Sequence, residues 1–498
     1  MSVKTNSSFT SESFYRAKDA SQEHIMMQDQ PTSPDQKLTA RTLSWKRDQT
    51  NGETSSVNNV TSSPDEVEAE HEEEKKKRWI EPTASQGFNS IIRSSWLNVL
   101  VVFIPVGIAS HFMAAKGSWP ATIPFIFNFI AIVPLAKLLG FATEDLSLRV
   151  GEVLGGLLNA TFGNAVELIV SIIALIQGLI TVVQASMLGS ILSNLLLVLG
   201  MCFFFGGIKY KEQSFNVTAA QTSASLLFIA TSSLLLPAAF YGSAYGLSNE
   251  SKANVTNEIL SISRATSIIM LIIYAAFLFF QLKTHKSFFL EAPKEAGKFE
   301  RSNSRIVRTD TEAGADNLNE GDEEEEEAPL MPLWMSIVLL AVITVLVAVC
   351  AEFLVDAITD VCEAWGVSQT FVGLVLLPIV GNAAEHVTAV TVAIKNKMDL
   401  ALGVAVGSSM QIALLVTPLM VIIGWIIGQP MSLYFNLFET AVMVIAVLMV
   451  NYLIMDGKSN WLEGLMLFCV YIIIAIAIFY YPESAGDSLS TGTNSTST

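Results

Sequence analysis

Two stretches of the sequence decide the fold: residues 163–200 read GNAVELIVSIIALIQGLITVVQASMLGSILSNLLLVLG, and residues 381–418 read GNAAEHVTAVTVAIKNKMDLALGVAVGSSMQIALLVTP. They align without a gap at an offset of 218 residues. Asn and Glu are rare inside apolar segments, so their recurrence indicates an internal repeat. The recurring pairs are Gly163 and Gly381, Asn164 and Asn382, Ala165 and Ala383, Glu167 and Glu385, Gly189 and Gly407, and Ser190 and Ser408.

Long apolar blocks surround both stretches, and 51% of the 498 residues are hydrophobic. Each block has about the 20 residues that a helix needs to cross roughly 30 Å of hydrocarbon. The composition therefore predicts an all-α membrane protein. We count eleven expected transmembrane helices, centred near residues 105, 130, 163, 193, 227, 271, 344, 381, 413, 446 and 472.

The two matched segments fall in the third and eighth expected spans, which are five spans apart. An odd separation turns the second copy upside down, so the pattern predicts an inverted repeat. Inverted repeats place the substrate near the middle of the membrane, on helices that are locally broken. We expect one extra N-terminal helix at 95–115, followed by two five-helix repeats at 120–282 and 333–482.

The polar segments lie outside these spans. We expect residues 1–94 to be a disordered cytosolic arm without a cleavable signal peptide, 283–332 a cytosolic loop and 483–498 a lumenal tail. Lys and Arg favour the cytosolic flanks of spans. Those that fall on one expected face are Lys75, Lys76, Lys77, Arg78, Arg93, Lys137, Arg149, Lys209, Lys211, Lys283, Lys286, Lys395, Lys397 and Lys458. The opposite face has fewer basic residues, Lys116, Lys252 and Arg264, and it carries the sequons at Asn249 and Asn254.

Charge and cysteine content exclude several classes of function. The net charge of −17 sits mostly in the arm and the loop, and it does not favour nucleic acid as a partner. The four cysteines have no CxxC spacing, so neither a zinc site nor a disulfide framework is expected. The sequence lacks HExxH, GxSxG and phosphate-binding loops, so we do not expect an enzyme.

The recurring glutamates carry the chemistry. An ionised carboxylate in hydrocarbon is costly, so Glu167 and Glu385 are expected to face a cavity, a partner or an ion. Two carboxylates that share one site repel each other, which favours proton uptake when the site is empty and a divalent cation when it is filled. A site that holds either the metal or protons has the minimum chemistry of an antiporter.

Further oxygen atoms are available beside the glutamates. Ca2+ prefers about six to eight hard oxygen ligands. Asn164 and Asn382 lie one turn from the glutamates, and backbone carbonyls near Gly163 and Gly381 can add more.

Accessory residues have both a functional and a structural interpretation. The serines Ser190, Ser408 and Ser409 can touch the ion or its water, whereas the neighbouring glycines more often mediate helix packing. His386 is either a packing residue or a proton-linked group. Gln184, Asn194 and Gln411 are weaker candidates that more often form interhelical hydrogen bonds.

Acidic residues elsewhere are also ambiguous. Glu352 and Asp356 lie one turn apart, so they form either a polar ion path or simply the wetted end of a span. The run Asp322, Glu323, Glu324, Glu325, Glu326 and Glu327 is either a solvated linker or a cytosolic collector of divalent cations.

The motifs GNAVE and GNAAEH, the Gly-Ser pairs that follow them and the acidic loop together resemble the cation/proton exchanger family, in particular the vacuolar Ca2+/H+ exchangers of fungi and plants. The resemblance covers about residues 95–482. It implies an eleven-span fold within the calcium/cation antiporter superfamily, and uptake of Ca2+ into a vacuole driven by lumenal protons. It also implies ion binding by Glu167, Glu385, Asn164 and Asn382, no cofactor, and a cytosolic acidic helix near 312–327 together with Glu144 and Asp145.

Other functions stay open at this point. The strongest alternative is a Na+-driven cation/Ca2+ exchanger, although the GNA-x-E form favours protons. A passive cation channel is a weaker alternative, because one inverted pair at mid-membrane suits a carrier better. Mn2+ is a second candidate substrate, since it accepts similar oxygen ligands.

Overall fold

The computed structural model describes residues 82–247, 252–285 and 328–481, which all belong to one compact unit, Glu73–Thr498. The expected arm up to residue 81, the acidic run Glu323–Glu327, the sequon residue Asn249 and the tail 483–498 lie outside the described residues.

The end of the arm that we expected to be disordered is a helix, α3 (Ala84–Arg93). Thr83 and Gln86 form a capping box, in which each side chain accepts a hydrogen bond from the other residue's backbone N–H. This Thr-x-x-Gln signature is visible in the sequence and explains why the helix begins there. The expectation of disorder up to residue 94 is therefore corrected.

The described residues are mostly helical, as the composition predicted. Eight helices among them are long and apolar enough to cross a membrane, and two bent helix pairs raise the number to ten. Two further apolar helices, α18 (Ala383–Ile394) and α21 (Leu437–Leu453), are shorter. The count of eleven spans stays a prediction.

After α3, the first half of the chain continues with the 3-10 helix η1, which is the first part of the first candidate span. The elements of this half in order are η1 (Trp96–Val102), α4 (Phe103–Ala115), α5 (Thr122–Val150), α6 (Glu152–Phe162), α7 (Ala165–Ile176), α8 (Ile180–Leu192), the π-helix η2 (Ser193–Val198), α9 (Leu199–Lys209), the strand β1 (Gln213–Ser214), α10 (Val217–Leu247), α11 (Lys252–Phe279) and the π-helix η3 (Phe280–Thr284).

The second half repeats the pattern of broken helices and π-helical turns. Its elements are α14 (Leu333–Asp356), α15 (Ile358–Trp365), α16 (Gln369–Phe371), the π-helix η4 (Val372–Leu376), α17 (Leu377–Gly381), α18, α19 (Met398–Gln411), the π-helix η5 (Ile412–Val416), α20 (Thr417–Ile427), α21, the strand β2 (Lys458–Ser459) and α22 (Trp461–Phe479).

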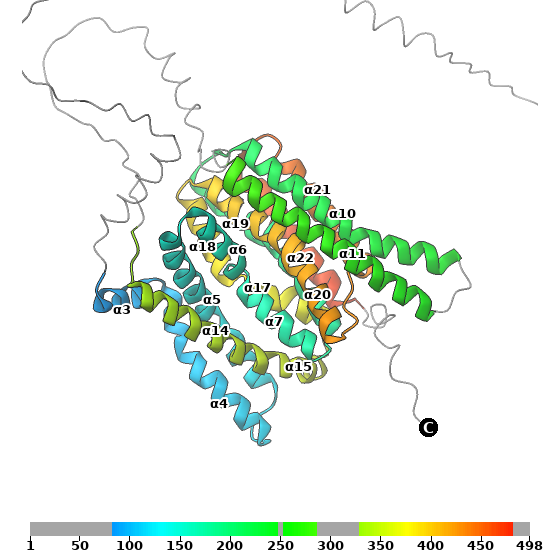
Figure 1. The fold of residues 1–498 in the computed structure, drawn as a ribbon, viewed down its shortest axis with the longest axis horizontal. Helices are drawn as coiled ribbons and strands as arrows, with labels where there is room; N and C mark the ends of the chain where they lie inside the picture. The colour runs from blue at the N-terminus through cyan, green and yellow to red at the C-terminus, as the bar shows by residue number, and fades with distance from the viewer. Residues whose placement is uncertain (1–81, 248–251, 286–327, 482–498) are drawn as a thin grey trace, which may run out of the picture. The chain divides into compact units, whose positions relative to one another are not determined.

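Helices of the two halves pack against each other. α5 packs on α14, α9 on α22 and α10 on α21, and Figure 1 shows α5 beside α14 and α10 beside α21. The segment Ile180–Lys209 is the most central, since 72% of its apolar window is buried, compared with 22% for Trp96–Ala115. The outer helices expose large apolar side chains, as expected for surfaces that face lipid.

Contacts at the helix ends define two faces of the bundle. At the basic face, where α9 and α18 end, Lys209 Nζ donates to the Ile394 carbonyl at 3.0 Å. β1 and β2 pair antiparallel at this face, with Gln213 opposite Ser459. At the opposite face, where α7 and α14 end, Gln177 Nε2 donates to Asp356 Oδ1 at 2.5 Å. Lys209, Lys395 beside Ile394, and Lys458 in β2, three of the lysines that we assigned to one side of the membrane from sequence, therefore lie at one face.

Candidate functional site

Both copies of the GNA motif lie at breaks between helices. Asn164 separates α6 from α7 with φ −105° and ψ 24°, and Asn382 separates α17 from α18 with φ −88° and ψ 4°. The axes of α6 and α7 differ by 48°. Each break leaves backbone carbonyls at the end of one helix and N–H groups at the start of the next, which is the arrangement that binds ions inside membrane carriers.

Each break places a glutamate in the first turn of the following helix. Glu167 lies in the first turn of α7 and is 5% exposed, and Glu385 lies in the first turn of α18 and is half-buried. The positive end of a helix dipole favours an anionic group at this position. The two carboxylates are therefore held at breaks between two helices.

Glu167 reaches across to the other copy of the motif. A Cβ atom on Gly381 would lie 2.7 Å from Glu167 Oε1, so only glycine allows this approach without a shift. Glu385 is held differently, because its Oε1 accepts a hydrogen bond from Ser408 Oγ at 3.0 Å. Gly163 is exposed and takes no corresponding position over Glu385.

The two asparagines make reciprocal contacts between the halves. Asn164 Nδ2 donates to Gln411 Oε1 at 2.6 Å, and Asn382 Nδ2 donates to Ser193 Oγ at 3.1 Å. Ser193 and Gln411 are themselves 218 residues apart, like the asparagines. Reciprocal contacts of this kind are what a twofold relation between two units produces.

A third contact lies between equivalent positions. Ser409 Oγ donates weakly to the carbonyl of Ile191 at 3.4 Å, and these two residues are also 218 positions apart. Residues that are equivalent in the two copies meet only where the two units cross. Ser409 of α19 and Ile191 of α8 therefore lie where the two repeats contact each other.

Several buried oxygens near the breaks have no hydrogen-bond partner among the described residues. They are Oδ1 of Asn164, Oδ1 of Asn382, Oε2 of Glu385 and Oγ of Ser190. A buried polar atom without a partner costs free energy, and such atoms call for an explanation. Carboxylate, amide and hydroxyl oxygens are ligands that suit a hard cation such as Ca2+.

A small cavity lies beside Glu167, with about the room of one water molecule. Residues of α5, α7, α8, α14 and α17 form its walls. They include Ile132, Ser186, Leu354, Leu377 and the motif glycine Gly381. Most of the wall is apolar, so the carboxylate of Glu167 is its main polar feature.

The accessory candidates divide into two groups. His386 and Asn194 are buried, and His386 Nε2 and both side-chain polar atoms of Asn194 lack partners in the described structure. Gln184 is instead used for structure, because its Nε2 donates to the carbonyls of Ser432 at 2.9 Å and Tyr434 at 3.0 Å.

The acidic candidates outside the motif are either exposed or already hydrogen-bonded by the chain's own donors. Glu352 and Asp356 are exposed near the end of α14, which agrees with the wetted end of a span. Glu144 is exposed near the end of α5.

Asp145 differs from the expected cation collector. Its carboxylate is 4% exposed, and it accepts hydrogen bonds from Leu330 N at 2.6 Å, Met331 N at 3.2 Å and Ser336 Oγ at 2.6 Å. Arg149 lies 3.8 Å away and also donates to the Met331 carbonyl. The chain's own donors occupy this carboxylate, so it ties α5 to the start of α14.

Sequence reasoning missed Ser193 and gave Gln411 little weight. The signal that could have found them was available: both are polar residues within spans, and both occupy the same position in the two copies. Serine and glutamine look unlike, so a search for identical residues passes over the pair.

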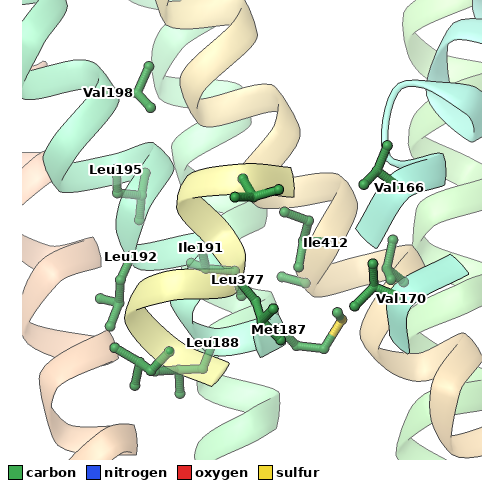
Figure 2. Packing of buried hydrophobic residues seen from close by; sticks show 14 of the residues in the cluster. Val166, Val170, Met187, Leu188, Ile191, Leu192, Leu195, Val198, Leu377 and Ile412 are labelled. Carbon is green, nitrogen blue, oxygen red and sulfur yellow. The ribbon is translucent and has the colours of Figure 1, made fainter. Parts of the chain in front are cut away.

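Packing around the breaks is unequal. η4 and α17 pack closely against α8, and Figure 2 shows Leu377 of α17 among Met187, Leu188 and Ile191 of α8. α6, the counterpart of η4 and α17, packs on α5, α7 and η3 but has no similar packing on α19 among the described residues.

Comparison with known proteins places these features in a family. The profile of the Sodium/calcium exchanger protein family matches residues 120–283 and 335–480, which are close to the two repeats expected from sequence.

Individual relatives are similar over most of the chain. The Vacuolar calcium ion transporter of Schizosaccharomyces pombe is 47% identical over 394 residues, which cover 79% of this chain and 87% of the relative. The Ca(2+)/H(+) antiporter of Aphanothece halophytica is 43% identical over 384 residues, 77% of this chain and 96% of the relative. The crystal structure of the Ca2+/H+ antiporter protein YfkE superposes with a TM-score of 0.59 at 34% identity, covering 77% of this chain and all of that one.

Proposed function

Because the chain belongs to the Sodium/calcium exchanger protein family, we propose that it is a secondary active antiporter that exchanges protons for Ca2+ across a membrane. Relatives named as a vacuolar calcium transporter and as Ca2+/H+ antiporters support protons as the driving ion over Na+. The observation that carries the proposal is the pair of glutamates at equivalent helix breaks, surrounded by buried oxygens that lack partners.

The site that we propose consists of Glu167, Glu385, Asn164 and Asn382, with carbonyl oxygens at the ends of α6 and α17. Two carboxylates balance the charge of one Ca2+, and the asparagine Oδ1 atoms add neutral ligands. When Ca2+ leaves, the carboxylates repel each other and bind protons instead. This exclusion couples the two ions.

The layout that we propose is one N-terminal span followed by two inverted five-helix units, 120–282 and 333–482. The reciprocal asparagine contacts and the contact between Ser409 and Ile191 support it. The eleven spans then require α18 and α21 to cross as parts of broken or short helices.

We place the basic face in the cytosol, because lysine and arginine are retained there. The N-terminus is then cytosolic and the C-terminus lumenal. The named relatives favour the vacuolar membrane, where an acidic lumen supplies the protons. Since the packing of α6 is looser than that of α17, the conformation described is open toward the cytosol.

An ion-swap experiment tests the proposed function. Purified protein in proteoliposomes is given an acid interior, or instead a Na+-loaded interior without a pH gradient, and uptake of radioactive Ca2+ is followed. We expect uptake with the acid interior only, and its loss with a protonophore. Uptake that follows Na+ and ignores the pH gradient would replace this proposal with Na+-driven exchange.

The same vesicles test the site and the substrate. Glu167→Gln and Glu385→Gln are expected to abolish uptake, whereas Glu352→Gln, which changes an exposed glutamate of the same length, serves as the matched control. Competition by Mn2+ measures whether it is a second substrate, since it binds similar oxygens.

A further inference from the structure

One charged residue within a span has no role in the proposed site. Lys137 lies in α5 and is half-buried, and its Nζ donates to Thr388 Oγ1 of α18 at 3.3 Å. A lysine in a membrane segment is costly unless it faces water or a partner. Lys137 turns toward α18 rather than to a free carboxylate, so its position requires an explanation.

The contact places the ammonium group close to Glu385. Thr388 follows Glu385 by three residues on α18, and residues at this spacing are neighbours on one helix face. The Thr388 hydroxyl already donates to the Ala384 carbonyl at 2.9 Å, so it offers the ammonium only a neutral lone pair. The positive charge therefore stands within roughly 10 Å of the Glu385 carboxylate, whose Oε2 has no partner in the described structure.

Lys137 lies between Glu385 and the basic face. α18 runs from Glu385 at the break to Ile394 at the basic face, so Thr388 and the ammonium lie between the glutamate and that face. This is the side on which α6 is loosely packed.

We propose that Lys137 is an affinity-setting charge for the cytosol-facing site, which weakens Ca2+ binding and acts as an internal counter-ion for Glu385 when no cation is bound. The inference rests on the proposed function. The charge of +1 on the ammonium repels the double charge of a bound Ca2+. Lys137 therefore weakens Ca2+ binding from this side and speeds its release back to this side.

The alternative role for Lys137 is structural, in which its hydrogen bond to Thr388 fixes α5 against α18. Three variants separate the two roles. Lys137→Met removes the charge and the donor, Lys137→Arg keeps the charge, and Thr388→Val removes the hydroxyl but keeps the charge. Lys137→Gln replaces the methionine variant if that variant does not fold.

The test measures the KM for Ca2+ at the basic face in acid-loaded proteoliposomes, and Ca2+-dependent thermal stabilisation of the purified proteins. We expect Lys137→Met to lower the KM and the Ca2+ concentration for half-maximal stabilisation about three- to tenfold. Lys137→Arg and Thr388→Val are expected to match the wild type, and high salt is expected to shrink the difference.

Two results would overturn the inference: an unchanged Ca2+ affinity in Lys137→Met, or an equal shift in all three variants, which would assign Lys137 to packing. Wild-type protein that binds Ca2+ but shows no acid-driven uptake would contradict the proposed function instead. In that case the thermal measurement still decides the effect of the Lys137 charge on Ca2+ binding.

Discussion

The two helices that lead into the GNA motifs differ sharply in packing, although their sequences align. Leu154 and Leu157 of α6 are 57% and 47% exposed, whereas their counterparts Val372 and Val375 in η4 are 0% and 6% exposed. A carrier with two equivalent gates at the same degree of closure would show equal burial. Within the proposed carrier mechanism, we interpret this difference as a closed gate at η4 and α17 and an open gate at α6.

The glycines that face these helices show the same difference. A Cβ on Gly189 of α8 would overlap the Leu374 carbonyl, so α8 and η4 touch backbone to backbone. At Gly407 of α19, its counterpart, a Cβ would meet no atom of the described structure within 4 Å. If the two gates alternate, α6 must approach Gly407 as closely as η4 approaches Gly189.

The largest effects on stability and on Ca2+ uptake are expected when valine replaces Gly189 or Gly407. Gly189→Val forces apart a packed backbone contact, so we expect a loss of stability of about 3 kcal/mol or more, measured by thermal unfolding in detergent. Gly407→Val has room in this conformation and is expected to unfold near the wild-type temperature, yet to lose Ca2+ uptake because α6 cannot close.

Ca2+-dependent thermal stabilisation is the control for Gly407→Val. We expect stabilisation to be kept, since the open site still binds the ion. Normal uptake in this variant would show that α6 does not close on α19, and the comparison of the two gates would fail.

The asparagines provide the second test, because their contacts are reciprocal. Asn164→Ala and Asn382→Ala each remove one ligand oxygen and one interhelical hydrogen bond, so we expect each to weaken Ca2+ binding by roughly 10- to 100-fold. Half-maximal thermal stabilisation by Ca2+ measures the effect. A large loss in one variant with none in the other would break the proposed twofold relation.

Changing the glycine before α6 is expected to give a smaller effect. Gly151 precedes α6 with φ +82° and ψ 164°, a conformation that is almost restricted to glycine, whereas Gly366 ends α15 with φ +65° and ψ 32°. Gly151→Ala is expected to cost about 1–3 kcal/mol and to slow uptake. Gly366→Asn is the matched control, since asparagine tolerates the left-handed region. Equal stability and uptake in both variants would show that Gly151 is not a hinge.

The smallest effect is expected at the surface of the basic face. A hydrogen bond from Lys458 Nζ to Glu212 at 2.7 Å and the charge of Glu212 raise the pKa of Lys458. A lysine whose pKa is raised in the folded state stabilises the fold at every pH below about 10.4, the ordinary lysine pKa, and this stabilisation is lost only at higher pH. The contribution of the Lys458–Glu212 pair to stability is therefore constant between about pH 5 and 8. Exposed pairs contribute little. We expect Lys458→Met to leave the melting temperature and the pH profile of uptake unchanged, and a shift in either would contradict this.

The sequence predicted what depends on local chemistry. The repeat was expected to lie on locally broken helices, and both copies of its GNA-x-E motif lie at such breaks. The first span, expected at 95–115, is found at Trp96–Ala115. The capping box of α3 was also present in the sequence but was overlooked within a polar arm.

What depends on long-range packing could not be predicted. Asp145 lies in an acidic pair at the end of α5, and nothing local indicates that the backbone of Leu330 and Met331 would occupy its carboxylate. The different exposure of α6 and η4 likewise could not be predicted from the sequence, because both segments are apolar and an apolar helix can be packed or exposed.

Release of protons when Ca2+ binds tests the central claim most directly, because it needs neither vesicles nor an imposed gradient. Purified protein in weakly buffered detergent solution near neutral pH is titrated with Ca2+ while the pH is recorded. We predict that wild-type protein and Glu352→Gln release protons in proportion to bound Ca2+, and that Glu167→Gln and Glu385→Gln release few or none. Wild-type protein that binds Ca2+ without releasing protons, or Glu385→Gln that releases as many as the wild type, would contradict exchange at a site made by both glutamates.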